Sequence, residues 1–417
     1  MEARDDAQAE RMVGSSGQGR RIDSPMARSR LLTAWDRMWD LVLEHRWVLL
    51  SGWGLLVGAV QLLTAPRWLG SWHYIVAGVG ALTGPHPFEI YATHPELQMG
   101  PVTFVLSTPF VLLGGPLGLI SAAMAMELLG LLGLREARAL LPPGDVVGER
   151  RWFLTSLAVA AGWNVLALRY GHPDDVLALF AAVLALRLLR SDAVLRSALL
   201  IAISIDCKPW TAPLAFVLLS APRRKWVLAA GVLALAVVAA WLPFVVSAGA
   251  LRATSFTIAV DPTASIRLLG LASAETPPWC RPAQVLVGSA LVAVAARRNQ
   301  WNAALLIVVV VRLLLDPATH AYYDAGLLVA ASVFDIGAVL PIATLVALIG
   351  VHLPPILHAP SPMQAALRLV ALLLLLGLSL VIRHRRRFDL LVAPPLEELG
   401  GVERAQLLPP RSSTTAA

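Results

Sequence analysis

The chain has 417 residues, of which 57% are hydrophobic and 15% charged, with a mean hydropathy of +0.69. Water-soluble proteins carry about 25% charged residues, so this composition excludes that class and indicates an integral membrane protein. The net charge of +7 does not require nucleic acid. The basic residues flank apolar runs, which membrane topology explains, and we expect no nucleic-acid partner.

Both ends of the chain are polar. Residues 1–30 lack the apolar middle of a cleavable signal peptide, and we predict a disordered cytoplasmic tail there. Residues 388–417 contain two Pro-Pro pairs and are expected to form a second disordered cytoplasmic tail. The transmembrane domain is predicted between them, over 31–387.

Within that domain, apolar runs approach the roughly 20 residues that a helix needs to cross a bilayer, and no barrel-type alternation occurs. The sequence therefore predicts an all-α transmembrane bundle. The expected runs are 47–65, 102–134, 152–169, 174–190, 197–220, 226–247, 283–296, 301–315, 322–334, 336–352 and 364–382.

Arginine-rich flanks set the expected orientation, because basic loops remain cytoplasmic. The run 197–220 fits only if it is two short helices broken at Asp206–Trp210, where Pro209 cannot donate a backbone hydrogen bond. This gives about twelve membrane segments with both termini cytoplasmic. The loops then expected outside are 66–101, 170–174, 248–282, 316–321 and 353–363, with the tip 206–210.

The first outer loop contains HPFEIYATHPELQMGP (86–101), where prolines stiffen the backbone around Glu89 and Glu96. A general base must be held within about 3 Å of the hydroxyl that it deprotonates, which a rigid loop allows. The alternative is that both glutamates are ordinary solvated loop acids.

RYGHPDD (169–175) and DCKPW (206–210) place further charges at the outer boundary. Asp174 is explained in part as a helix N-cap, but the pair of acids beside His172 and Arg169 also suggests a functional site. A charge such as Lys208 costs at least about 2.5 kcal/mol in a bilayer. Lys208 therefore either pairs with Asp206 or attracts an anionic group such as phosphate.

LDPATHAYYDAG (315–326) brings His320 beside Tyr322 and Tyr323, which also suit an interfacial aromatic belt. The two cysteines, Cys207 and Cys280, fall in different segments and provide neither a disulfide framework nor metal-ligand spacing. Phosphate-binding glycine loops and common hydrolase motifs are missing. We predict no cofactor and no metal.

Together these motifs resemble the GT-C superfamily of polytopic glycosyltransferases, and most closely the actinobacterial α-mannosyltransferases of glycosyltransferase family 87. The resemblance covers about 47–335 and rests on the order of FEIYATHPELQMGP, RYGHPDD, CKPW and THAYYD. It implies an enzyme that transfers a sugar, such as mannose, from a polyprenyl-phosphate donor to a lipid or glycan acceptor. The active face would be extracytoplasmic, in the cell membrane.

The resemblance also implies residue roles. Glu89 or Glu96 would be the catalytic base, with His94 or Asp174 as substitutes, because Pro87-Phe88-Glu89 stands where the family has an aspartate ahead of the tyrosine. The donor-phosphate ligands would be Lys208, His320 and Arg169. The remaining residues assigned to substrate binding are Tyr91, His172, Asp174, Asp175, Tyr322 and Tyr323.

Two other classes stay open. In a transporter or lipid flippase, the same charges would form a pathway, whereas charges gathered on one face favour an enzyme. A non-catalytic scaffold of the GT-C type would keep the fold without the base.

Overall fold

The computed structural model describes residues 25–64, 68–247, 256–336, 338 and 340–382. Every regular element in these ranges is a helix, which confirms the all-α prediction. The chain divides into two units between Leu49 and Leu50. The first contains α1 (Pro25–Glu44), whose start overlaps the tail predicted over 1–30. Residues 1–24 of that tail, and the tail predicted over 388–417, lie outside the described residues.

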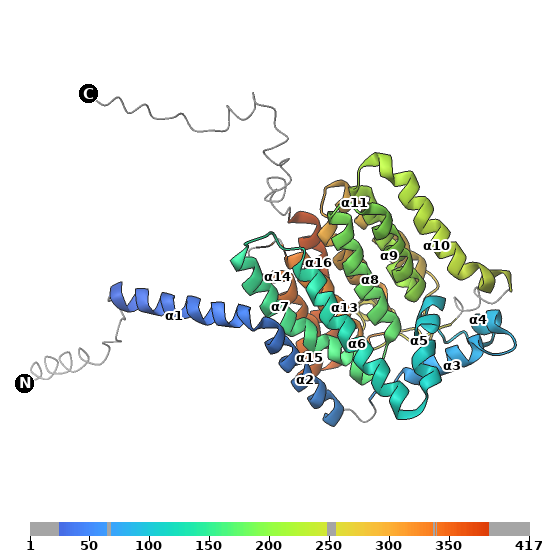
Figure 1. Cartoon of the computed structure of the whole chain (residues 1–417). Coiled ribbons are helices and arrows are strands. Elements are labelled where there is room, and N and C mark those ends of the chain that lie inside the picture. Colours follow the sequence, from blue (N-terminus) through green and yellow to red (C-terminus); the bar gives the residue numbers. More distant parts are fainter. Residues whose placement is uncertain (1–24, 65–67, 248–255, 337, 339, 383–417) are drawn as a thin grey trace, which may run out of the picture. The chain divides into compact units, whose positions relative to one another are not determined.

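The second unit is a bundle of packed helices (Figure 1). Its main helices are α2 (Arg46–Thr64, which begins in the first unit), α3 (Trp72–Leu82), α4 (Ile90–Thr93), α5 (Pro101–Leu113), α6 (Gly115–Arg138), α7 (Val146–Asn164), α8 (Pro173–Arg190), α9 (Val194–Cys207), α10 (Trp226–Val246), α11 (Cys280–Arg297), α12 (Ala304–Leu315), α13 (Tyr323–Asp335), α14 (Ile342–Ala347), α15 (Leu353–Ile356) and α16 (Ser361–Val381). Shorter 3₁₀ or π elements are η2 (Pro87–Glu89), η3 (Val165–Tyr170), η4 (Pro209–Ser220), η5 (Arg223–Lys225), η7 (Ser265–Leu269), η8 (Trp301–Ala303) and η9 (Leu348–His352).

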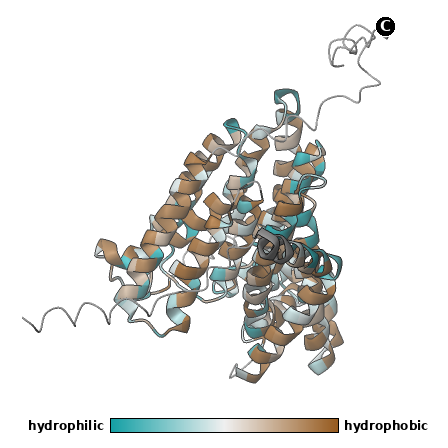
Figure 2. Ribbon diagram, turned by 90° about the vertical axis from the view of Figure 1, so that its left-hand side faces the viewer, coloured by the Kyte–Doolittle hydropathy of each residue, from teal (hydrophilic) through white to brown (hydrophobic). Residues whose placement is uncertain are grey.

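Among the described residues, five helices are long and apolar enough to cross a membrane: Arg46–Thr64, Gly115–Arg138, Val146–Tyr170, Arg223–Val246 and Ser361–Val381. Hydrophobic residues run along the helices, whereas hydrophilic residues gather at many of the turns (Figure 2). Large apolar side chains such as Leu55, Val227 and Val381 remain exposed on these helices. This distribution suits contact with lipid and supports the prediction of an integral membrane protein.

The run 197–220 is broken at Lys208, as predicted. Helix α9 ends at Cys207 and η4 begins at Pro209. Just beyond η4, the Lys225 ammonium lies 2.6 Å from a carboxylate oxygen of Asp192, just before α9. The chain therefore reverses direction at Lys208, and the end of η4 lies on the same side of the bundle as the start of α9.

The run 102–134 was expected to be continuous, and it is not. Helix α5 ends at Leu113, Gly114 forms the turn, and α6 starts at Gly115; both glycines have positive φ (66° and 46°). After this turn α6 packs against α5 so closely that a Cβ on Gly118 would lie 2.2 Å from the Phe110 carbonyl oxygen. The composition of the run concealed the turn, because the two glycines lie within an otherwise apolar stretch.

The loops expected to be cytoplasmic do meet at one end of the bundle, here called the basic end. Arg138 pairs with Glu149, and Arg187 pairs with Glu136. The Arg190 guanidinium lies 5.9 Å from the Trp301 ring centroid. The basic end thus comprises 135–151, 187–196, 221–225 and 297–302.

The loops expected outside meet at the other end, here called the acidic end. Backbone N–H groups of Leu69, Gly70 and Ser71 donate to the carbonyls of residues 168–170. The N–H of Gly100 donates to Cys207, and that of Asp261 donates to Pro317. The acidic end comprises 68–101, 168–175, 206–210, 256–282, 316–324 and 352–361.

Candidate functional site

The centre of the acidic end is a buried charge network. Asp174 and Asp175 lie in the first turn of α8, and Lys208 lies at the break between α9 and η4. The Lys208 ammonium pairs with Asp174 and lies 3.5 Å from a carboxylate oxygen of Asp175. All three side chains are buried. The partner of Lys208 is therefore Asp174, and not Asp206, whose pairing with Lys208 was one of the two alternatives left open by the sequence.

Arg312, near the end of α12, brings a second cation to the network. Its guanidinium lies 3.5 Å from Asp175 and 3.6 Å from Asp316. The ring centroids of Trp210 and Tyr323 lie 4.5 Å and 4.0 Å from the Arg312 guanidinium carbon. Such packing supports a charge that is withdrawn from water.

Three near-parallel rings lead from the network to the surface. The ring centroids of His172 and Tyr322 lie 3.8 Å apart, and those of Tyr322 and His320 lie 5.3 Å apart. His172 is buried, Tyr322 is half-buried and His320 is exposed. Motifs 150 residues apart in the sequence thus form one site.

The position of His172 follows from the backbone around it. Gly171 adopts a left-handed conformation (φ 64°) after η3, and a Cβ there would lie 2.6 Å from the Leu69 side chain. His172 is the N-cap residue of α8 and makes no side-chain capping hydrogen bond. Asp174 is therefore not the N-cap residue, contrary to the sequence-based interpretation.

The loop 86–101 is well packed, but its glutamates lie apart from the network. Tyr91 is buried, donates its hydroxyl proton to Met99 O at 2.8 Å, and stacks on Trp241. Glu89 is 48% exposed and lies 3.8 Å from His86. Glu96 is 39% exposed and lies 3.1 Å from His94. Within the described ranges, neither glutamate forms an ion pair with a lysine or an arginine.

Arg169 and His320 lie near the rim of the ring stack. Arg169 lies over the Tyr170 ring at 5.7 Å, and Tyr170 in turn contacts Tyr322. Neither Arg169 nor His320 has an acidic ion-pair partner in the part of the chain that the structure describes. Desolvation, and next the proximity of His172, lower the pKa of His320, so its ring is neutral at pH 7.

The ligand atoms of His172, Asp174 and Asp175 lie within 4.8 Å of one another, a spacing that suits a metal ion. However, Lys208 and Arg312 already neutralise the two carboxylates. A divalent cation would have to overcome their repulsion at short range. We therefore assign these three side chains to the charge network.

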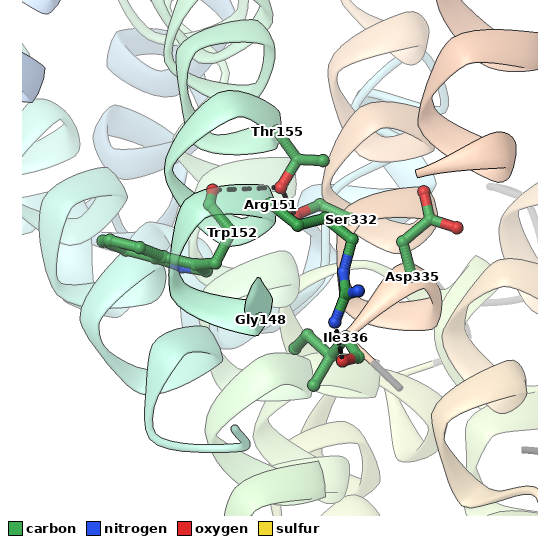
Figure 3. A pocket seen from close by; sticks show the side chains of 7 residues that line it. All are labelled: Gly148, Arg151, Trp152, Thr155, Ser332, Asp335 and Ile336. Carbon is green, nitrogen blue, oxygen red and sulfur yellow. Dashed lines mark hydrogen bonds between the residues drawn. The ribbon is translucent and has the colours of Figure 1, made fainter. Parts of the chain in front are cut away.

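A pocket at the basic end is lined by side chains whose hydrogen bonds join neighbouring helices, which indicates a structural role (Figure 3). Arg151 donates to Ile336 O at 2.8 Å, and Thr155 and Ser332 hydroxyls lie 3.0 Å apart. Asp335 accepts hydrogen bonds from the backbone of Ala343 and Thr344. These bonds hold α7, α13 and α14 together.

Sequence reasoning missed Arg312 and the role of Trp210, whose indole N–H donates to Asp175 at 3.0 Å. A lone arginine in the apolar run ALLIVVVVRLLL was a sufficient signal, because intramembrane charges mark buried pairs or functional sites. The same signal marks Arg368, which pairs with Asp324. The chain matches no protein-family model, and neither a curated protein nor a solved structure shows significant similarity to it.

Proposed function

We propose that the protein is an integral membrane glycosyltransferase of the GT-C type. It moves a sugar, mannose in the simplest case, from a polyprenyl-phosphate donor to a lipid or glycan acceptor. The acidic end faces outward from the cell membrane, with about twelve membrane segments and both termini in the cytoplasm.

The observation that supports this proposal best is an apolar cleft with Pro173, a sequence neighbour of two residues of the charge network, in its lining. The cleft is lined from α3, α5, α6 and α8 by residues that include Trp72, Phe110, Met126 and Pro173. Pro173 lies between His172 and Asp174 in the sequence. A lipid-linked sugar needs this combination, because its hydrocarbon tail prefers apolar surroundings and its head group needs charge.

The contacts suggest different roles for the basic side chains at the acidic end. The donor phosphate meets Arg169, which has no acidic partner among the described residues, and neutral His320, which donates a hydrogen bond. Lys208 and Arg312 add positive potential from within the network. This charge helps the leaving prenyl phosphate, because a developing anion is stabilised by fixed positive groups.

A transporter is the second candidate, and one observation favours it. A further set joins buried Asp324 of α13 to buried Arg368 of α16 at 3.4 Å and to half-buried His352 of η9 at 3.9 Å, so ionisable groups also lie between these elements. A proton or ion pathway would use such groups.

The test is sugar transfer from radiolabelled polyprenyl-phosphate mannose in membranes that contain the wild type, Arg169→Ala, Glu89→Gln or Glu96→Gln, at matched expression. Transfer by the wild type that weakens in Arg169→Ala would support the enzyme. If wild-type membranes transfer no more sugar than empty membranes, with mannose or arabinose donors, the glycosyltransferase proposal fails. Donor flipping measured in proteoliposomes would then support the transporter.

A further inference from the structure

We infer that His172 takes the proton from the acceptor hydroxyl and that Asp174 positions it for this step. The inference rests on the proposed glycosyl transfer. It places the base in the buried network instead of in the loop that carries Glu89 and Glu96.

The side chain of His172 is 7% exposed, and neither ring nitrogen has a hydrogen-bond partner among the described residues. Buried polar atoms without partners are uncommon and require an explanation. His172 Nδ1 lies 3.3 Å from Oδ1 of Asp174, which is also without a hydrogen bond. A slight approach of the two side chains makes this a hydrogen bond, as often happens when substrate binds.

Asp174 is held as a carboxylate because Lys208 pairs with its other oxygen. A carboxylate can only accept hydrogen bonds, so the proton of neutral His172 must lie on Nδ1. Nε2 then carries a free lone pair. The same logic sets the tautomer of the histidine in Ser-His-Asp enzymes.

The neighbouring acids are poorly suited to be the base. Asp175 accepts from Trp210 at 3.0 Å and lies 3.5 Å from both Lys208 and Arg312, so its negative charge is already shared. Asp174 is held in the same way by Lys208. At the centre of the network, Asp174 and Asp175 form ion pairs with lysine or arginine among the described residues, and the imidazole of His172 does not.

Charged and titratable groups contact this ring directly or through a short chain of contacts. On α8 they are the two aspartates, and on α12 and its following loop they are Arg312 and Asp316. The others are Arg169, Tyr170, Lys208, His320, Tyr322 and Tyr323. Tyr322 stacks on one face of the imidazole. Nε2 lies in the plane of the ring and is itself buried, so the acceptor reaches it only when neighbouring side chains move aside.

The step balances in atoms and charge. The acceptor O–H bond breaks, its proton passes to Nε2, and the acceptor oxygen forms a bond to the anomeric carbon of the sugar. The bond between that carbon and the phosphate oxygen breaks, and its electron pair leaves with the prenyl phosphate. The resulting imidazolium lies beside the Asp174 carboxylate, which stabilises it.

The tautomer can be measured without turnover. In detergent-solubilised protein labelled with ¹⁵N-histidine, at a pH where histidine is neutral, we expect His172 to show a protonated Nδ1 and an unprotonated Nε2. The His172→Gln variant assigns the signals. A proton on Nε2, or an imidazolium under these conditions, would overturn the dyad whatever the activity.

The second measurement uses the transfer assay. His172→Gln should lower kcat by about 10²–10⁴-fold, as expected for loss of a general base, with a smaller change in KM for the donor. His73→Gln is the matched control, because His73 is an exposed histidine at the acidic end. A wild type that transfers sugar while His172→Gln keeps its kcat would refute the inference and leave the proposed function intact. A wild type with no transfer would refute both, and the NMR measurement would still decide the tautomer.

Discussion

The ammonium of Lys208 lies against the carboxylate of Asp174, and both side chains are buried between helices. Lys208→Met keeps much of the side-chain volume but leaves Asp174 without its main counter-charge. Removal of one partner from a buried ion pair costs about 3–5 kcal/mol. Thermal unfolding in detergent should show this loss.

A matched variant at the basic end separates this effect from the general loss of a lysine. Lys225 pairs with Asp192, whose side chain is 64% exposed, so Lys225→Met should cost no more than about 1 kcal/mol. Equal losses in the two variants would contradict a special role for the Lys208 pair.

Gly100 has no side chain, which allows the backbone before the break between α9 and η4 to pack closely against it. A Cβ at this position would lie 1.9 Å from the carbonyl oxygen of Asp206, although φ is an ordinary −76°. Gly100→Ala should therefore destabilise the protein by about 1–3 kcal/mol through overpacking. Gly231→Ala is the control, since a Cβ there meets no atom within 4 Å, and alanine should be neutral or stabilising in α10. If both variants unfold at the wild-type temperature, this contact does not hold the loop.

Because of Asp261, the stability of the folded protein should decrease at low pH. Partial burial raises its pKa, but hydrogen bonds from the Thr263 hydroxyl and N–H outweigh this effect, so the pKa lies below 3.8. The contribution of Asp261 is full above pH 3.8 and is lost as the pH falls through the folded-state pKa. Unfolding temperatures of the wild type and Asp261→Asn should converge over that range, and a constant difference would show that the carboxylate charge is not involved.

A histidine that gains an acidic partner on folding stabilises the folded state at low pH. His320 should instead destabilise the folded state as the pH falls. Its pKa is lowered from 6.5, first because packing against Tyr322 and Tyr323 desolvates part of the ring, and next because His172 lies nearby. Between the folded-state pKa and 6.5 the unfolded chain binds the extra proton, so stability falls as the pH falls. From pH 8 to pH 5, the unfolding temperature of the wild type should decrease more than that of His320→Gln. Parallel curves would contradict this assignment.

The orientation of the bundle can be tested with cysteines, because both native thiols are buried. Thr93 is exposed at the acidic end, and Arg224 is exposed at the basic end. A membrane-impermeant maleimide added to intact cells should label Thr93→Cys, whereas Arg224→Cys should react only after lysis. The reverse pattern would place the network on the cytoplasmic side.

The positions of many helices were predictable because long apolar runs carry a strong signal. Helix α3, in the range expected to be an outer loop, and the turn between α5 and α6 were not predicted. The break at Lys208 was predictable as well, since Pro209 and the positive-inside rule agree there. The partner of Lys208 was not predictable. Asp206 is closer in sequence, but the rotation of α9 directs it to Trp241, while the turn before α8 delivers Asp174. Side-chain pairing across helices depends on packing angles that periodicity does not contain.

The candidate site was predicted in outline only. RYGHPDD, DCKPW and THAYYD do converge, but FEIYATHPELQMGP contributes its buried Tyr91 to packing, and its glutamates stay toward solvent. Arg312 was overlooked because hydropathy averages over a window, in which one arginine among leucines and valines hardly changes the mean. A buried charge in an apolar run is therefore found by inspecting each residue separately, and not by averaging hydropathy over a window.

The turn at Lys208 also bears on how the protein is made. Translation delivers Asp174 and Asp175 first, Lys208 next, and Arg312 about a hundred residues later. Until Arg312 arrives, Asp175 has only the cation that it shares with Asp174, and an unpaired charge in the bilayer costs at least about 2.5 kcal/mol. The nascent chain therefore carries an incomplete set of charges while about a third of its residues, from Asp175 to Arg312, are synthesised. The network can close only after α12 is made, so α8 and α9 are synthesised well before their charges are fully paired.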